Sequence, residues 1–589
     1  MRTIASWLAF AAALAFSSPT AAQSPRYDLA KAIADYEAFD REEDPIASGR
    51  EGDRAALSRL PGVTPADAVR RKAALETFKV RLEQISAKDL SAEDRLNHRF
   101  LKYTVDLALE GFKFDAGRLG FTNEGGPELL LQNLGQGMVV RTRADAEAYL
   151  ARLEASAKFI ADTTANLRRG VQTGFVQSRA TTEVALSLFK AALALPVTDG
   201  GPMAPFAKLP DSLPAVDQEA LRGRARAILD MKVRPARESF VKAVESEVLP
   251  VAKPAIGALH LPGGRDWYRY LARLYTTTDL SPDQIHEIGL KEVARLRREM
   301  EAEMAAAGFQ GTFPQFLVFL RTDRRFYVTS REALMEKSAR IAKRADNELP
   351  KFFGKLPRLP YGVREVAREI EENYTSGRYD PGSPRLGIAG GLMVNTSHLD
   401  QRPLYEHPAL MLHEGVPGHH LQIAIQQELG ELPWFRRHAE VTAFVEGWGL
   451  YSELLGQDMG IYRDAYERFG KLSMEMWRAC RLVADTGIHW KGWTLEQARA
   501  CFTENTALAP KNIENEVQRY IAWPGQALAY KIGELKVREL RKKAETELGT
   551  AFDLRRFHDA VLWGGPLPLD LLGARINAWI AGEKAATGK

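Results

Sequence analysis

The sequence lacks the features that define several large classes of protein. Only two of its 589 residues are cysteines, Cys480 and Cys501, which excludes a fold framed by disulfides. These two thiols could form one bond or remain separate buried groups, and the sequence leaves both states open. Long runs of alternating apolar and polar residues are nearly absent, which argues against a β-sheet protein. The chain has no internal repeat and no low-complexity tract.

No block of like charge is present either. The formal net charge is only +4, and basic and acidic residues alternate along the whole chain. Proteins that bind nucleic acids concentrate their basic residues, so we expect no nucleic-acid partner. A hydrophobic content of 45% and a charged content of 26% are those of a globular protein that folds in water. The composition does not predict the oligomeric state.

Long apolar runs are also missing. No segment after the first 23 residues approaches 18 consecutive apolar residues, so no stable membrane insertion is expected. The N-terminus combines Arg2, an apolar run over residues 4–16 and small residues before position 23, the pattern of a secretory signal peptide. We expect cleavage after Ala22, giving a signal peptide of residues 1–22. No cysteine follows for lipid attachment, and the mature protein is expected in the periplasm or outside the cell.

Helical periodicity is what the sequence has in abundance. In residues 281–304, Ser281 is placed to cap a helix, Pro282 to occupy its first turn and Gln284 to close a capping box. The apolar residues that follow recur at helical spacing: Ile285, Ile288, Val293, Leu296, Met300 and Met304. The segment from Ser91 has the same pattern. We therefore predict a mainly α-helical protein.

Proline and glycine indicate how the chain is divided. They concentrate at residues 196–214 and 250–264, which are the best candidates for boundaries. We predict an N-terminal helical region over residues 23–255 and a catalytic helical region over residues 256–589.

One segment interrupts the helical pattern. LGIAGGLMVNTS, residues 386–397, is rich in glycine and apolar residues and predicts a β-strand, with a glycine-rich loop as the alternative. The edge of a strand beside an active site can pair with an extended peptide through its backbone. Gly391, Val394 and Asn395 are therefore candidate substrate-binding residues.

The stretch HEGVPGHHLQ, residues 413–422, indicates chemistry. A histidine followed at once by a glutamate is typical of zinc peptidases, whose second histidine lies four residues after the first on one helix. Here Pro417 stands at that position, and the next histidines are His419 and His420. In an undistorted helix these would lie roughly 9 and 10.5 Å along the axis from His413. Imidazole nitrogens bound to one zinc ion must approach within roughly 3.5 Å, which excludes an undistorted helix.

Pro417 and Gly418 provide a way to distort that helix. A proline inside a helix removes a hydrogen bond and clashes with the carbonyl four residues back, which is that of His413. Glycine tolerates almost any backbone angles, so the residues between can loop out. If two residues loop out, His419 becomes the second ligand, and if three do, His420 does. The spacing leaves both open.

A third ligand is expected on a neighbouring helix, because a catalytic zinc ion takes three protein ligands and a water molecule. Residues 439–455 have helical spacing and contain Glu446, which stands next to Val445 and close to Trp448. An unpaired carboxylate among such residues would be costly, and a metal would account for it. The alternative is a pair with an arginine. Glu453 shares the face of Glu446 and is a candidate as a further ligand or as a partner of one.

Five motifs, occurring in order, carry a resemblance to a known family: TTTDLSPDQIHEIGLKEVARL, HEGVPGHHLQ, FVEGWGLYSE, RACRLVADTGIH and YIAWPGQALAYKIGE. They resemble the bacterial family catalogued as domain of unknown function 885, over most of the mature chain. That family is similar to the helical gluzincin metallopeptidases, such as thimet oligopeptidase and carboxypeptidase Taq. The resemblance implies a large, two-lobed, mainly α-helical metallopeptidase-like fold with a small sheet beside the active-site cleft.

The resemblance also implies roles for single residues. His413 corresponds to the first zinc ligand, Glu414 to the general base and Glu446 to the glutamate ligand. Gluzincins place a glycine before the second histidine, so His419 aligns better than His420. The two inserted residues are a departure from the gluzincin pattern. One zinc ion per chain is the expected cofactor.

Further candidates lie in the C-terminal motifs. His489, Tyr520 and Tyr530 are candidate donors for the oxyanion that forms during hydrolysis, with core packing as the alternative. Asp485 and His489 stand four apart on one helical face and are expected to form a supporting pair or an incidental one. Arg481 and Arg519 are candidates for holding a substrate carboxylate, and the alternative is that each forms a salt bridge on the surface.

The function these residues predict is that of a secreted zinc-dependent metallopeptidase acting on extended or short peptides. Two alternatives are a metal-dependent hydrolase of another amide or ester, and a non-catalytic peptide-binding protein of the same fold. The presence of Glu414 argues against the last, because a structural zinc site has no use for a water-activating carboxylate.

Overall fold

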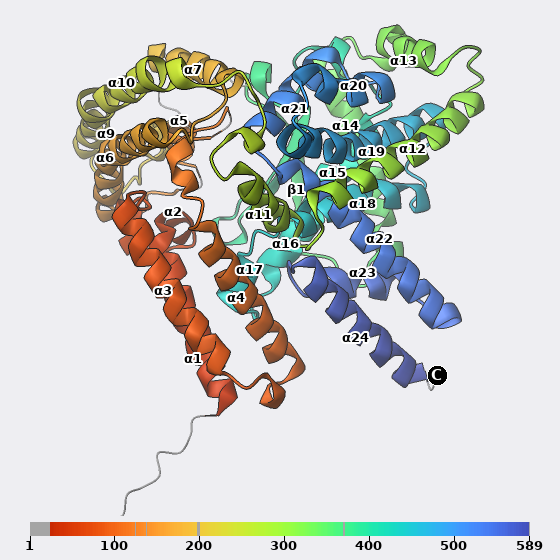
Figure 1. The fold of residues 1–589 in the computed structure, drawn as a ribbon, viewed down its shortest axis with the longest axis horizontal. Helices are drawn as coiled ribbons and strands as arrows, with labels where there is room; N and C mark the ends of the chain where they lie inside the picture. The colour runs from red at the N-terminus through yellow and green to blue at the C-terminus, as the bar shows by residue number, and fades with distance from the viewer. Residues whose placement is uncertain (1–23, 124, 137, 197–200, 369–370, 588–589) are drawn as a thin grey trace, which may run out of the picture.

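The computed structural model describes residues 24–587, apart from 124, 137, 197–200 and 369–370 (Figure 1). The protein is mainly α-helical with one small sheet, as the sequence predicts. The expected signal peptide, residues 1–22, lies outside the described residues. In the part of the chain that the structure describes, no helix has the length and apolar character needed to cross a membrane.

The described residues of the first half of the chain form ten α-helices, two of which begin at capping boxes, Thr64–Asp67 and Thr142–Asp145. Their bounds are α1 (Pro25–Glu43), α2 (Pro45–Arg50), α3 (Pro65–Gln84), α4 (Ala92–Gly111), α5 (Pro127–Asn133), α6 (Arg143–Thr173), α7 (Arg179–Ala194), α8 (Ala204–Ala207), α9 (Ala215–Ile228) and α10 (Arg234–Ala243).

The second half contains the remaining helices. The capping box predicted at Ser281 and Gln284 starts one of them. Their bounds are α11 (Gly264–Thr276), α12 (Pro282–Ala306), α13 (Phe313–Thr322), α14 (Arg331–Phe352), α15 (His407–Glu414), α16 (His419–Glu428), α17 (Trp434–Arg437), α18 (Thr442–Asp458), α19 (Ala465–Thr486), α20 (Leu495–Asn505), α21 (Pro510–Ala522), α22 (Ala529–Leu548), α23 (Leu554–Leu562) and α24 (Leu569–Thr587).

A three-stranded sheet precedes α15 in the chain. Its strands are β1 (Tyr361–Glu365), β2 (Gly377–Asp380) and β3 (Gly390–Val394), in the order β1-β3-β2. Strand β3 runs parallel to β1 and antiparallel to β2. The strand predicted within residues 386–397 is therefore present, and it is the central strand of the sheet.

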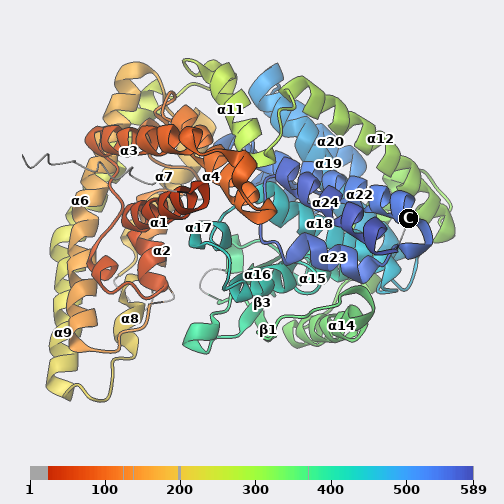
Figure 2. The same cartoon turned by 90° about the horizontal axis from the view of Figure 1, so that it is seen from below.

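Two hydrophobic cores divide the helices. The larger core joins α1, α3 and α4 to the helices of the second half, while the smaller core lies within residues 121–248. In the larger core α12 packs along α19, and α18 packs along α22. Figure 2 shows α6 and α9 at the left of the molecule, the sheet with α15 and α16 near its lower middle, and α12 at the right. The first three long helices thus share a core with the helices that carry the His-Glu motif.

The two cysteines form a disulfide. Cys480 on α19 is bonded to Cys501 on α20, with 5.7 Å between their Cα atoms. This settles the alternative that the sequence left open, and it ties α20 to a helix whose last three turns are buried.

Candidate metal centre

The His-Glu helix is interrupted at the predicted position. Helix α15 ends at Glu414 and α16 begins at His419. The Gly418 N–H donates a hydrogen bond to the carbonyl of Leu412 at 3.0 Å. A Cβ atom at position 418 would lie 2.0 Å from the carbonyl oxygen of His413, so only glycine fits this turn. The Gly-Val-Pro-Gly sequence therefore folds the chain back so that the two histidines can approach each other.

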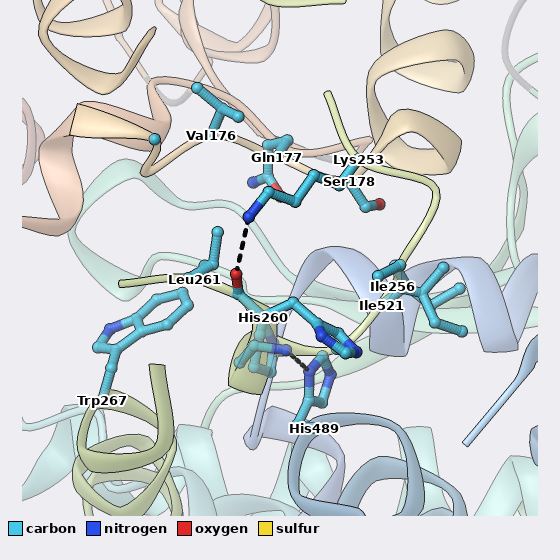
Figure 3. A pocket seen from close by; sticks show the side chains of 15 residues that line it. Val176, Gln177, Ser178, Lys253, Ile256, His260, Leu261, Trp267, His489 and Ile521 are labelled. Atoms are coloured by element: carbon cyan, nitrogen blue, oxygen red, sulfur yellow. Dashed lines mark hydrogen bonds between the residues drawn. The ribbon is translucent and has the colours of Figure 1, made fainter. Parts of the chain in front are cut away.

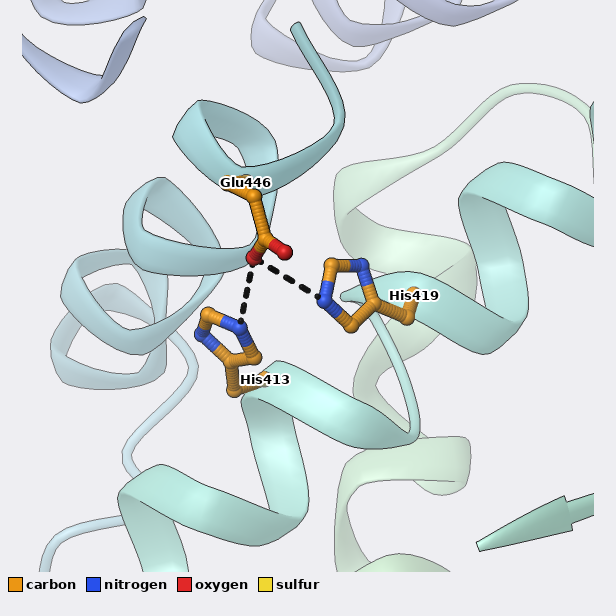
Figure 4. Close-up of side chains that lie close together, drawn as sticks. All are labelled: His413, His419 and Glu446. Atoms are coloured by element: carbon orange, nitrogen blue, oxygen red, sulfur yellow. Dashed lines mark ion pairs between the residues drawn. The ribbon is translucent and has the colours of Figure 1, made fainter. Parts of the chain in front are cut away.

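Three side chains meet across this turn (Figure 4). The Oε2 atom of Glu446, on α18, lies 3.5 Å from Nε2 of His413 and 3.4 Å from Nε2 of His419. All three ligand atoms lie within 4.8 Å of one another. Two donors bound to one tetrahedral zinc ion at about 2.0–2.1 Å are separated by roughly 3.4 Å, so this group has the dimensions of a zinc site.

The electrostatics of the group suit a cation. Glu446 Oε2 is buried and accepts no hydrogen bond from any described residue. Burial opposes the charge of this carboxylate, but His413 and His419 hold its pKa well below its usual range. Burial likewise opposes charge on His413, yet Glu446 and Glu453 raise the pKa of its imidazole to about 9. One carboxylate and two imidazoles form a donor set that zinc prefers, so the residues present fit the expected ion.

His420 does not join this group. Its Nδ1 lies 3.0 Å from the hydroxyl of Tyr379, and its ring packs 4.5 Å from the ring of Tyr361. Burial lowers the pKa of His420 to about 4, so its ring is neutral at pH 7. The structure therefore brings His419 rather than His420 to His413 and Glu446.

Glu453 lies behind His413. Its Oε1 accepts a hydrogen bond from Nδ1 of His413 at 2.8 Å, and Nη2 of Arg478 lies 3.3 Å from the same oxygen. Glu453 has no exposed surface, and it is not one of the three converging side chains. Metal-binding histidines commonly donate their second N–H to a carboxylate, which fixes the ring orientation. Glu453 is placed for that role, and Arg478 is a partner that the sequence did not indicate.

Glu414 points to the sheet. Its Oε2 accepts a hydrogen bond from the backbone N–H of Tyr379, on β2, at 2.8 Å. Because β2 pairs only with β3, its other edge faces Glu414. Tyr379 thus touches the candidate general base through its backbone and His420 through its hydroxyl. This residue could not be predicted from the sequence, because the short strand β2 has no clear alternation of polar and apolar residues.

The prediction that β3 offers an open edge for binding substrate is wrong. Both edges of β3 are occupied: Gly391 pairs with Gly362 on β1 and with Asp380 on β2. Val394 is buried, and the Asn395 side chain donates hydrogen bonds to two backbone carbonyls of residues 371–374. The edge beside Glu414 belongs to β2, and its Tyr379 N–H is bonded to that carboxylate.

His489 does not face the metal group. Its Nδ1 accepts a hydrogen bond from the Ala258 N–H at 2.9 Å, so its Nε2 donates to the carbonyl of Tyr520 at 2.9 Å. Burial lowers the pKa of this ring to about 4. The pocket beside it, drawn in Figure 3, has a volume of about 30 Å³, too small for a peptide. The expectation that His489 supplies an oxyanion donor is wrong, because both its nitrogens serve the backbone.

Asp485 and Tyr520 are also occupied within the core. Asp485 accepts hydrogen bonds from the Tyr268 hydroxyl at 2.5 Å and the Gly525 N–H at 3.1 Å, and it does not pair with His489. The Tyr520 hydroxyl donates to Glu516 at 2.7 Å. These bonds explain why both residues are buried, and they contradict the role of Tyr520 as an oxyanion donor.

The two candidate arginines have protein partners. Arg481 is buried, donates to the Tyr520 hydroxyl at 2.9 Å and pairs with Glu516 at 2.8 Å. Arg519 donates to Gln526 at 3.2 Å and stacks 5.6 Å from the ring centroid of Trp523. Arg481 therefore forms a salt bridge, as the alternative interpretation expected. Both guanidinium groups already bind other residues of the protein.

Tyr530 lies on a helix that touches α18 next to Glu446, and its ring centroid is 4.2 Å from the guanidinium of Arg481. It lies at the start of α22, one turn before Gly533. A Cβ atom at Gly447, the residue after Glu446, would lie 2.5 Å from the Cα of Gly533, so the two helices touch there. The Tyr530 hydroxyl makes no hydrogen bond to another described residue. Of the three predicted donors, it is the one that the structure leaves available.

Fold and site together define a helical protein in which three residues, His413, His419 and Glu446, form a group that could hold a metal ion. Comparison with family models assigns it further: the chain matches the model described as "Bacterial protein of unknown function (DUF885)" over residues 45–576. The protein therefore belongs to this family, as its motifs predicted. No functionally curated protein matches it.

Solved structures share the fold. The "putative lipoprotein" of Colwellia psychrerythraea is 28% identical, with a TM-score of 0.88 over 95% of this chain and 100% of that one. A Shewanella oneidensis protein of the same description and of unknown function is 16% identical, with a TM-score of 0.70 over 94% of this chain and 99% of that one. A Bacillus anthracis structure described as a "putative oligoendopeptidase F" is 10% identical over 87% of this chain and 96% of that one, and its TM-score of 0.30 is too low to show a shared fold.

Proposed function

We propose that the protein is an exported zinc-dependent peptidase. The observation that supports this proposal most is the convergence of His413, His419 and Glu446, with Glu414 immediately after the first histidine. The periodicity of helices α15 and α16 does not require a turn at residues 415–418. The turn brings the imidazoles of His413 and His419 to one carboxylate, that of Glu446. The proposed export agrees with the names given to the similar bacterial structures.

His413, His419 and Glu446 would hold the zinc ion, and Glu453 would keep the His413 ring in place. A bound zinc ion lowers the pKa of its water toward 7 and polarises the substrate carbonyl. Glu414 then takes the proton of the attacking water and delivers it to the leaving amine. The backbone N–H of Tyr379 holds one oxygen of Glu414 and leaves the other for this transfer. Tyr530 is the candidate donor to the oxyanion.

An extended peptide is the substrate that the surroundings favour. The outer edge of β2 lies next to Glu414, and a strand edge binds peptide backbones of many sequences. Hydrolysis of another amide or ester would use the same three metal-binding residues. The edge of β2 is the feature that favours peptides over these other substrates.

Metal content tests the first half of the proposal. Elemental analysis of the purified mature protein is expected to give close to one zinc ion per chain, lost in His413→Ala and in Glu446→Ala. His438→Ala is a matched control, because His438 lies in the same histidine-rich region and pairs instead with Glu51. A protein that binds no zinc when it is supplied would overturn the proposal.

Cleavage tests the second half. Native protein is incubated with a mixed peptide library, and products are identified by mass spectrometry. Glu414→Gln is expected to keep its zinc and to lose about 10²–10⁴-fold in rate, the usual contribution of a general base. Zinc binding without cleavage of any peptide would leave the non-catalytic alternative, and cleavage that persists in Glu414→Gln would remove this residue from the mechanism.

A further inference from the structure

A large cavity lies where the first helices meet α11 and the segment after α21. Its volume is about 780 Å³, within the range of roughly 300–1,000 Å³ typical of ligand sites. None of the three metal-binding side chains lines it. Aromatic rings from distant parts of the chain form much of its wall: Tyr36, Phe39, Phe112, Tyr270, Tyr275 and Trp523.

Trp523 is held in place yet exposed. Its side chain is 39% exposed, while its Nε1–H donates a hydrogen bond to the Tyr275 hydroxyl at 2.6 Å. The guanidinium of Arg519 packs 5.6 Å from the ring centroid. An exposed tryptophan with a fixed ring offers a large contact surface at little entropic cost, a common property of binding sites.

The charged residues of the cavity wall are paired, with one exception. Arg71 lies 3.5 Å from Glu43, and Arg169 contacts Asp115. Asp40, on α1, forms no ion pair or hydrogen bond through its side chain with any described residue. Burial, and then the nearby carboxylate of Asp44, raises the pKa of Asp40 to about 6. The cavity therefore combines aromatic walls with a carboxylate that is in ion-pair contact with none of the described cations, although His438 and Arg41 are near enough to lower its pKa.

We propose that this cavity binds the N-terminal ammonium group of a peptide, with Asp40 as the counter-ion and the aromatic rings around it. That the ligand is a peptide rests on the proposed function. That the bound group is an ammonium follows from the aromatic walls and the carboxylate of the cavity. A cation over an aromatic face is attracted by the electrons of the ring, and a charged hydrogen bond to a carboxylate adds to this attraction. A lysine side chain would offer the same ammonium chemistry and is distinguished below.

The test measures binding without cleavage. Metal-free Glu414→Gln protein is titrated calorimetrically at pH 7 with the amide of Phe-Ala-Ala-Phe, its N-acetylated copy, and an N-acetylated copy containing lysine. The free-amine peptide is expected to bind at least about tenfold more tightly than the acetylated one. Adding Asp40→Asn should abolish that difference. Glu42→Gln, an exposed carboxylate on the same helix, should preserve it.

Trp523→Leu provides a second test, because it should weaken binding of the free-amine peptide without touching Asp40. Equal binding of the free-amine and acetylated peptides, or an unchanged difference in Asp40→Asn, would overturn the proposal. If only the lysine-containing copy binds in an Asp40-dependent way, the assignment to the N-terminus is overturned. These outcomes are separate from the proposed function, since peptide cleavage by native protein is measured independently.

Discussion

Glu446 and Glu453 stand seven residues apart on one face of α18, and their environments give them different roles. Glu446 faces both imidazoles, whereas Glu453 contacts only the far nitrogen of His413 and receives Arg478 on the same oxygen. The seven-residue spacing predicts that both carboxylates lie near the candidate metal site. It cannot predict which one lies in front of the ring, because that depends on how α15 crosses α18.

Glu453→Gln is expected to weaken zinc binding about 10–100-fold, the usual effect of losing the carboxylate behind a metal-binding histidine. The amide keeps the shape of the side chain but loses the negative charge that favours the ring orientation. Competition with a chromogenic chelator measures the affinity. Glu467→Gln is the control, because Glu467 is a buried carboxylate in the first turn of α19 that pairs with Arg463, just before that helix. An affinity equal to that of native protein would contradict this role for Glu453.

His489 gives a pH dependence of stability with a definite sign. Its folded pKa of about 4 lies below the ordinary value of 6.5, so the unfolded chain takes up the proton first. The stabilisation is complete above pH 6.5 and is lost as pH falls toward 4, by about 1.4 kcal/mol per pH unit. The thermal midpoint of His489→Gln should therefore fall less than that of native protein between pH 7 and pH 5. Equal falls would show that this ring is not held neutral.

The local path of α15 and α16 was predictable, whereas partners distant in sequence were not. Pro417 and Gly418 act on their own helix, so their effect follows from backbone sterics. His489 bonds to Ala258, which lies 231 residues away, and nothing in local spacing indicates that contact. The strand at residues 390–394 was predicted from its composition, but its central place in the sheet depends on two strands too short to show a pattern.

Helix α18 leaves room for His413 by means of Gly449. A Cβ atom there would lie 2.7 Å from the His413 ring. Alanine is favoured over glycine inside a helix by about 1 kcal/mol, so Gly449→Ala should keep the helix while displacing the ring. We expect a loss of zinc affinity of about tenfold or more, because metal sites tolerate shifts of only about 0.5 Å.

Gly223→Ala is the matched control for this change. Gly223 lies inside α9, and a Cβ atom at that position meets no other atom within 4 Å. The same substitution there should leave zinc affinity unchanged and raise the thermal midpoint slightly. Unaltered zinc binding in Gly449→Ala would mean that His413 has more freedom than its contacts indicate.

The two halves of the chain are joined through Arg436, on α17. This side chain is fully buried and donates hydrogen bonds to Asn97 at 2.6 Å and Glu93 at 3.0 Å, both on α4. Its other end donates to the carbonyl of Gly564. A guanidinium can satisfy all three acceptors at once because its donors form a rigid fork. The helices that carry the candidate metal site therefore depend on α4 for the position of the segment between α16 and α18.

Arg436→Met should destabilise the whole molecule, because it leaves the buried acceptors of Asn97 and Gly564 without a donor. A loss of roughly 3 kcal/mol is expected, since each unsatisfied buried group costs about 1–3 kcal/mol. The thermal midpoint and the rate of limited proteolysis measure it. Arg437→Met is the control, because that neighbour is only half-buried and donates to the nearby carbonyl of Leu432. If both variants melt together with native protein, α4 and α17 are held by apolar packing alone, and the polar contacts of Arg436 contribute little to joining the two halves.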